Sequence, residues 1–238
     1  MTQALFDKYY PKHRFEGGTV PFLRLCANEI SPGSRILEIG AGPDNPFSEF
    51  LSQRGTVTGI DVDADVRTNR WLKEAFVYDG REMPLADSSF DGCCSNWVLE
   101  HVEHPADHFR EVARILRPGG VYCFRTPNLY HYVSMGARLL PFFLHLNLAN
   151  RLRALDESAH DPYPTFYRAN TRSALRRLCS EAGFDQPSIQ MIEPEPSYGA
   201  AHALLFYPMM FYERIVNRFE FTASLRITML VAVRKAKR

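Results

Sequence analysis

The segment from Arg35 to Gly42 constrains the fold of this chain more than any other, because a short apolar run there meets two glycines. The run from Ile36 to Ile39 suits a strand that is buried on both faces. Gly40 and Gly42 permit a tight turn and a close approach of the backbone to a ligand. The segment therefore predicts a parallel strand that ends at a binding turn.

A helix and a second strand are expected after this turn. Asp44 or Asn45 can cap the helix, and Gly55 is expected to end it. The residues from 56 to 60 form the second strand, and Asp61 follows it about twenty residues after the glycines. An acid in this position can accept hydrogen bonds from ribose hydroxyls. The arrangement therefore predicts a nucleoside site.

The residues after the glycines indicate which kind of nucleoside fits. A dinucleotide fingerprint reads G-x-G-x-x-G, whereas this chain has Asn45 where the third glycine would stand. Asp44 would also bring negative charge to the helix N-terminus, where a pyrophosphate would bind. A ligand with ribose but without phosphate therefore fits better than a dinucleotide.

The motif Glu38-Ile-Gly40-Ala-Gly42, with Asp61 downstream, resembles that of the class I S-adenosylmethionine-dependent methyltransferases, whose first motif has the form E/D-x-G-x-G. The resemblance covers about residues 30 to 126 and two later segments. It implies an α/β, Rossmann-like fold with a seven-stranded, mostly parallel sheet, helices on both faces and an antiparallel last strand. It also implies S-adenosyl-L-methionine as the cofactor and S-adenosyl-L-homocysteine as its product.

The resemblance extends to individual cofactor contacts. Asp61 would hold the ribose, and Asp79 would receive the adenine amino group, although Asp79 also fits an ordinary turn acid. The signature from Ser95 to Val102, S-N-W-V-L-E-H-V, would line the methionine part of the cofactor. The expected cofactor-binding residues are Glu38, Gly40, Ala41, Gly42, Asp61, Val62, Asp79, Gly80, Asn96 and Trp97.

His101 is the candidate catalytic residue, because an imidazole near neutrality can take a proton from a hydroxyl acceptor. The alternative is a histidine that is only hydrogen-bonded within its loop. His104 and His108 follow, but an amphipathic helix over 105–116 would place His108 on its wetter side. No cysteine and histidine set has structural-zinc spacing, so no metal is expected.

Other elements follow from periodicity and turn residues. A helix is expected over 64–73, and another begins after Thr171 and ends at Gly183. Further strands are expected at 75–78, 92–95, 121–125, 188–192 and 227–234.

Charge and cysteine content limit the partners and the compartment. The chain has 28 basic and 27 acidic residues, which does not suggest a nucleic-acid footprint. Of its five cysteines, those at 93, 94 and 123 lie in apolar runs and are expected to be reduced packing residues. No signal peptide is visible, and no apolar run reaches the roughly 18 residues of a spanning helix. A cytoplasmic protein is expected.

Three segments surround the expected core. Residues 1–30 are expected to form an N-terminal helical cap or flap, and residues 31–238 the methyltransferase domain, with insertions at about 129–169 and 193–223. Apolar residues repeat at helical spacing in the second insertion. That helix would pack under a substrate lid or in a homodimer, or it would contact a lipid-linked substrate or a membrane surface. Expected acceptor contacts are Tyr10, His13, Tyr130, His131 and Tyr167.

The resemblance implies an enzyme of the EC 2.1.1 class that transfers a methyl group to a small molecule. The expected acceptor is a hydroxyl of a saccharide, a lipid-linked compound or a natural product, which defines an O-methyltransferase. Two other classes remain open. One is a scaffold or regulatory protein of the same fold without catalysis, and the other is an NAD-dependent oxidoreductase.

Overall fold

The computed structural model describes residues 2–11, 17–139, 163–196 and 203–237. The chain divides into two compact units. One comprises residues 1–21, 127–165 and 191–229, and the other comprises residues 22–126, 166–190 and 230–238.

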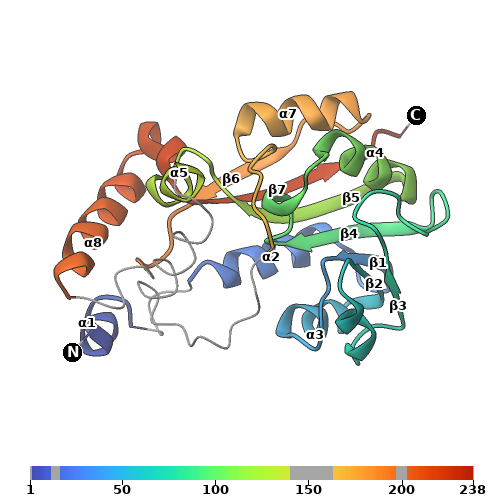
Figure 1. The fold of residues 1–238 in the computed structure, drawn as a ribbon, viewed down its shortest axis with the longest axis horizontal. Helices are drawn as coiled ribbons and strands as arrows, with labels where there is room; N and C mark the ends of the chain where they lie inside the picture. Colours follow the sequence, from blue (N-terminus) through green and yellow to red (C-terminus); the bar gives the residue numbers. More distant parts are fainter. Residues whose placement is uncertain (1, 12–16, 140–162, 197–202, 238) are drawn as a thin grey trace. The chain divides into compact units, whose positions relative to one another are not determined.

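A seven-stranded sheet forms the centre of the fold (Figure 1), and its strand order is β3-β2-β1-β4-β5-β7-β6. The pairs β1 with β2, β1 with β4, β2 with β3, and β4 with β5 are parallel. The last strand is antiparallel to β5, since Gly120 pairs with Lys235 and Asn128 pairs with Ile227. This arrangement confirms the expected Rossmann-like sheet. The strands are β1 (Ser34–Ile39), β2 (Gly55–Asp61), β3 (Glu74–Val77), β4 (Phe90–Asn96), β5 (Leu116–Pro127), β6 (Ser188–Ile192) and β7 (Thr228–Arg234).

Helices cover both faces of the sheet. Figure 1 shows α4 and α7 on one face and α2 and α3 on the other. The α-helices are α1 (Thr2–Tyr9), α2 (Thr19–Glu29), α3 (Pro46–Ser52), α4 (Pro105–Ile115), α5 (Tyr132–Leu139), α7 (Arg172–Glu181) and α8 (Ala203–Arg218). The 3-10 helices are η1 (Ala64–Thr68), η2 (Leu99–His101) and η4 (Glu220–Leu225).

Helix α4 packs on the sheet through aromatic residues, and here one expectation is wrong. His108 was expected on the wetter side of the helix, but it is only 4% exposed. Its Nε2 lies 3.0 Å from the hydroxyl of Tyr122 on β5, and that hydroxyl lies 2.8 Å from the Ser95 hydroxyl on β4. Burial lowers the pKa of His108 to about 4, so the imidazole is neutral at pH 7. The buried tyrosine supplies the partner that a histidine needs in the core.

Two expected boundaries near the glycine turn also differ. Helix α3 ends at Ser52, and Gly55 opens β2 instead of ending the helix. A Cβ at Gly55 would lie 2.1 Å from the carbonyl oxygen of Ser34, so the pairing of β2 with β1 requires glycine there. The helix expected over 64–73 is only the short η1. Its continuation is blocked at Asn69, whose side-chain Nδ2 donates to Ser48 Oγ at 2.9 Å and whose backbone is extended.

The unit that contains α8 has its own small core. Phe206 of α8 is fully buried, and its ring lies 5.1 Å from that of Phe6 on α1. The Tyr10 hydroxyl donates to Glu213 Oε2 at 2.8 Å, and both side chains are buried. In this way α1 covers one side of α8.

Candidate functional site

The turn after β1 has the conformation that its glycines permit. Gly40 and Gly42 both have positive φ, +70° and +53°. Residues other than glycine rarely adopt this backbone conformation. The Gly40 amide donates to the carbonyl oxygen of Ile60 at 2.8 Å. The Gly42 amide donates to Oδ2 of Asp61 at 2.9 Å, and Oδ1 accepts from the Asp63 amide at 3.0 Å. Asp61 is therefore fixed beside the turn, at the carboxyl edge of the parallel strands.

The loop after β4 approaches the same turn. A Cβ at Gly40 would lie only 2.4 Å from Cγ2 of Val98, well inside van der Waals contact. Because valine is stiff at χ1, its methyl group cannot easily move away. Gly40 thus allows the β4 loop to pack directly against the backbone of the turn.

The residue that caps α3 is Asn45, and Asp44 has a different partner. Oδ1 of Asn45 accepts from the amides of Phe47 and Ser48 at 2.9 and 3.0 Å. The Asp44 carboxylate accepts from the Arg70 amide at 2.7 Å and pairs with the Arg70 guanidinium, and these contacts hold its pKa below the usual range. Arg70 therefore compensates the negative charge that was expected to oppose a pyrophosphate.

Glu38 is a buried acid on β1, directly before the turn, and is 2% exposed. Burial raises its pKa to about 8, against a hydrogen bond from Ser48 that lowers it, and the negative charge of Asp61 adds to the rise. Among the residues that the structure describes, Oε2 of Glu38 has no hydrogen-bond partner. A buried carboxylate oxygen of this kind fits a ligand that brings a positive charge or an N–H group.

The edge beyond β2 and β3 holds Asp79, Gly80 and Val62. Oδ1 of Asp79 accepts from the amides of Arg81 and Glu82 at 2.9 and 3.2 Å, so this acid caps a turn. Val62 is 47% exposed, directly after Asp61. A Cβ at Gly80 would lie 3.5 Å from Cγ1 of Val62, so the two residues are neighbours. Val62 is thus an exposed apolar side chain near Asp61 and Asp79, and it could pack on one face of a planar base.

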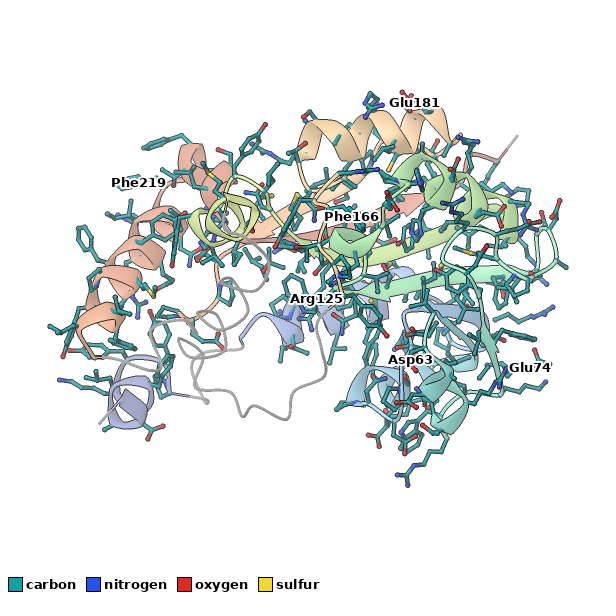
Figure 2. All side chains as sticks on the ribbon, viewed as in Figure 1. Asp63, Glu74, Arg125, Phe166, Glu181 and Phe219 are labelled. Carbon is teal, nitrogen blue, oxygen red and sulfur yellow. The ribbon has the colours of Figure 1, made fainter. Side chains whose placement is uncertain are left out.

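Arg125, at the carboxyl end of β5, is a residue of this edge that the sequence reading did not single out (Figure 2). Its guanidinium lies 5.0 Å from the ring of Trp97 and 5.3 Å from the ring of Phe22, and its Nε donates to Oδ1 of Asn96. Burial lowers its pKa to about 10, so it remains charged at neutral pH. Trp97 has φ of +60°, and its amide donates to the carbonyl oxygen of Arg125 at 3.1 Å. Arg125 could have been identified from the sequence, because it is a charged residue in an otherwise apolar strand.

Glu100 is a second residue that the sequence reading did not single out, although it lies within the S-N-W-V-L-E-H-V signature. It is 6% exposed, and burial raises its pKa to about 7. Oε2 accepts from the Thr126 hydroxyl at 3.2 Å. Its carbonyl oxygen accepts from the amides of Phe166 and Tyr167 at 2.8 and 3.2 Å. Glu100 thereby ties the segment that carries Phe166 (Figure 2) to the β4 loop.

The candidate base and one candidate acceptor contact lie beside Glu100. His101 ends η2 and is half-buried, and its amide donates to the carbonyl oxygen of Val98 at 2.9 Å. Tyr167 has φ of +52°, which is unusual for a bulky residue and costs roughly 1–3 kcal/mol. Hydrogen bonding to Glu100 holds this strained backbone next to the His101 loop.

The other candidate acceptor contacts belong to the unit that contains α8. Tyr10 is bonded to Glu213, and Tyr130 is 55% exposed. His131 is 1% exposed; its Nδ1 accepts from the Val133 amide at 3.2 Å, so Nε2 carries the proton and donates to Glu193 Oε1 at 3.2 Å. Both ring nitrogens of His131 are therefore held by the protein. His13 lies outside the described residues, as does much of the first insertion.

In the described part of the chain, no group of three or more histidine, cysteine, aspartate or glutamate side chains is arranged to hold a metal ion. None of the helices in that part combines the length and the apolar character required to cross a membrane.

Comparison with known proteins finds a family match over the part of the chain that contains the glycine turn and Asp61. Residues 37–124 match the family described as Methyltransferase domain. Over 202 residues the chain is 27% identical to the ubiquinone biosynthesis O-methyltransferase of Nitrosococcus oceani. This match covers 79% of this chain and 78% of that protein. Over 114 residues it is 35% identical to a 37.1 kDa transposon protein of Streptomyces fradiae. That match covers 44% of this chain and spans only 33% of the transposon protein.

A solved structure shares the fold over nearly the whole chain. The S-adenosylmethionine-dependent methyltransferase of Mesorhizobium loti superposes with a TM-score of 0.56 at 19% sequence identity. The superposition covers 90% of this chain and 96% of that one. At this identity the likeness concerns the arrangement of helices and strands.

Proposed function

We propose that this chain, whose residues 37–124 match the Methyltransferase domain family, is a class I S-adenosylmethionine-dependent methyltransferase that transfers the cofactor's methyl group to a hydroxyl group of a small molecule. The observation that carries this proposal is the hydrogen bond between Gly42 and Asp61. It fixes a carboxylate beside a glycine turn at the carboxyl edge of a parallel sheet, where open α/β sheets bind their ligands.

The residues at this edge fit S-adenosyl-L-methionine in charge and shape. Asp61 would accept from the ribose hydroxyls, and Asp79 would accept from the adenine amino group. Val62 would pack on the base. The orphaned Oε2 of Glu38 fits the cationic end of the cofactor, and a bound cation there would favour the ionised carboxylate. The remaining proposed contacts are Gly40, Ala41, Gly42, Gly80, Asn96 and Trp97.

The bound cofactor supplies an electrophilic methyl group on a sulfonium that is already a good leaving group. The protein then has to orient the acceptor for in-line attack and exclude water. His101 would take the proton from the acceptor hydroxyl. Glu100 would act as a positioning residue, because it holds the backbone of Phe166 and Tyr167 beside that histidine.

The acceptor is proposed as a saccharide, lipid-linked or natural-product hydroxyl. The name of the Nitrosococcus oceani relative, an O-methyltransferase of ubiquinone biosynthesis, supports an oxygen acceptor. Residues 1–30 and the insertions at about 129–169 and 193–223 would build the acceptor side. Tyr10, His13, Tyr130, His131 and Tyr167 would be its contacts. All five cysteines are buried and free of disulfides, which supports a reducing, cytoplasmic location.

Turnover separates this proposal from a scaffold of the same fold, because a shared fold does not imply a shared activity. The test is the transfer of a labelled methyl group from S-adenosyl-L-methionine to small molecules of a cell extract. We expect label in an extractable small-molecule fraction, in a bond that resists mild base as a methyl ether does. No transfer above a heat-inactivated control, despite cofactor binding, would favour the scaffold.

A further inference from the structure

Ser48 lies in the first turn of α3, and its side chain is fully buried. Its hydroxyl oxygen accepts a hydrogen bond from Nδ2 of Asn45 at 2.8 Å and another from Nδ2 of Asn69 at 2.9 Å. The backbone fixes both amides in this orientation, because Oδ1 of Asn45 accepts from the Ser48 amide at 3.0 Å. In the same way, Oδ1 of Asn69 accepts from the Trp71 amide at 3.1 Å. Two side-chain donors therefore converge on one hydroxyl group.

This arrangement decides where the proton of the Ser48 hydroxyl goes. A serine hydroxyl has two acceptor lone pairs and one proton. The two asparagine amides occupy both lone pairs, so the hydroxyl can act only as a donor. Its acceptor is the carboxyl group of Glu38 on β1, to which Ser48 gives a side-chain hydrogen bond. The proton of Ser48 is therefore committed to Glu38.

Glu38 has little else that favours its ionised form. Its side chain is 2% exposed, and Oε2 has no hydrogen-bond partner among the described residues. The titratable groups that face it from the neighbouring strands are Asp61 of β2 and Cys94 of β4. Burial raises the pKa of the Cys94 thiol to about 11, so this group is uncharged at pH 7. Neither group offers Glu38 a positive charge.

The empty protein consequently keeps a proton on Glu38 at neutral pH. Burial, together with the charge of Asp61, raises the pKa of Glu38 to about 8, although the hydrogen bond from Ser48 lowers it. A ligand that brings a positive charge to this carboxyl group would favour the ionised form. S-adenosyl-L-methionine brings such a charge in the ammonium group of its methionine part.

We propose that Ser48 is a positioning residue of the cofactor site: it stabilises the Glu38 carboxylate that receives the cofactor's ammonium group, and cofactor binding displaces a proton from Glu38 to the solvent. This inference rests on the proposed function, because it requires a ligand with the charges of S-adenosyl-L-methionine. It adds a residue outside the glycine motif and a proton that the site exchanges for its ligand.

The glycine turn does not depend on Ser48 alone. Nδ2 of Asn45 also lies 2.7 Å from the carbonyl oxygen of Ala41, and Nδ2 of Asn69 also lies 3.1 Å from that of Pro43. Both amides thus keep an acceptor when the Ser48 hydroxyl is removed. We therefore expect Ser48→Ala to fold and to act through the charge of Glu38.

The test is calorimetric titration with S-adenosyl-L-homocysteine at pH 7 in buffers of different ionisation enthalpy, which counts the protons released. The wild type should release about one proton per ligand, and its affinity should rise roughly tenfold from pH 6 to pH 7. The analogue 5′-methylthioadenosine, which lacks the ammonium group, should release none. Ser48→Ala should weaken the binding of S-adenosyl-L-homocysteine by about tenfold or more and that of the analogue by less than about threefold.

Two comparisons separate this role from a structural one. Ser52→Ala is the matched control, since Ser52 lies one turn further along α3 and its hydroxyl donates to the Glu49 carbonyl oxygen at 2.7 Å. It should bind both ligands as the wild type does. In a Glu38→Gln background, Ser48→Ala should change the affinity for S-adenosyl-L-homocysteine by less than about threefold, and proton release should be lost. Circular dichroism and the unfolding midpoint establish that each variant is folded.

The possible failures are distinguishable. Saturable binding of S-adenosyl-L-homocysteine without proton release overturns this inference and leaves the proposed function standing. The same holds if folded Ser48→Ala weakens both ligands equally, or weakens neither. If the wild type binds neither ligand, both this inference and the proposed function are wrong.

Discussion

Oδ2 of Asp61 accepts a hydrogen bond from the Gly42 amide at 2.9 Å, so the acid that ends β2 is locked to the turn that ends β1. Nineteen positions of sequence separate the two residues, yet the parallel pairing of β1 with β2 brings them to one edge. The conformation of the turn and the position of the acid therefore depend on each other.

Gly40→Ala should destabilise the protein more than Gly42→Ala. Both positions have positive φ, which costs alanine about 1–2 kcal/mol. Only at Gly40 would the new Cβ meet Val98, at 2.4 Å, whereas at Gly42 nothing lies within 4 Å. Overpacking adds about 1–3 kcal/mol. Urea unfolding measures both free energies. If the added methyl group does clash with Val98, then Val98→Ala should be less costly in the Gly40→Ala background than in the wild type.

The stability of the protein should fall as pH rises through the range in which Glu38 ionises. Its pKa is about 8 in the folded protein, against an ordinary value of 4.5, so the folded state binds the proton more tightly. This term favours folding fully below pH 4.5 and is lost between pH 4.5 and 8, with a span of about 4–5 kcal/mol. Urea unfolding at several pH values measures the slope.

Glu38→Gln should remove most of that slope. Glu100→Gln is the matched comparison, because the pKa of Glu100 is raised in the same direction but only to about 7. It should remove a smaller part of the slope. Equal slopes in the wild type and in Glu38→Gln would show that Glu38 ionises normally in the folded protein.

Arg125→Lys should destabilise the folded protein by about 1–3 kcal/mol, because lysine keeps the charge but loses the planar contact with Trp97 and the bond to Asn96. The left-handed backbone of Trp97 depends on the same contacts, so cofactor affinity should fall as well. Arg117→Lys is the control, since Arg117 forms an exposed ion pair with Asp91, and it should change stability by less than about 0.5 kcal/mol. Similar losses in both variants would contradict a special role for Arg125.

His101→Ala should slow methyl transfer by about 10²–10⁴-fold if His101 is the base. Affinity for S-adenosyl-L-homocysteine should stay within about threefold, since a base acts on the acceptor. His104→Ala is the control, because His104 is an exposed histidine three residues away that makes no side-chain cap bond to α4. The rate of label transfer and calorimetric titration measure the two effects. If His101→Ala and His104→Ala transfer the methyl group at the same rate, His101 is not the base and is only hydrogen-bonded within its loop.

Local patterns were sufficient to predict most of the sheet. The apolar run before Gly40, the cap at Asn45 and the stop at Gly183 each depend on neighbours within a few residues, and the structure contains all three features. The antiparallel last strand came from the family resemblance, and the pairing of Asn128 with Ile227 confirms it.

Other features depend on partners that are distant in the sequence. His108 of α4 is buried because Tyr122 reaches it from β5, and a helical wheel contains no such information. Asp44 is paired because Arg70 lies beside it. The contacts of Arg125 and Glu100 were hidden for the same reason, because the partners named here, Phe22 of α2 and Thr126 of β5, are distant from them in the sequence. Short-range periodicity predicts which face is buried, but not which polar groups meet there.

Calorimetric titration of the purified protein with S-adenosyl-L-homocysteine, S-adenosyl-L-methionine and NAD tests the central claim most directly. We predict saturable binding of the first two ligands and no heat with NAD. Asp61→Asn should weaken the binding of S-adenosyl-L-homocysteine by about tenfold or more, because an amide cannot accept from both Gly42 and Asp63 and also hold the ribose. Asp63→Asn should leave the binding of S-adenosyl-L-homocysteine unchanged. Saturation with NAD and no response to S-adenosyl-L-homocysteine would contradict the account.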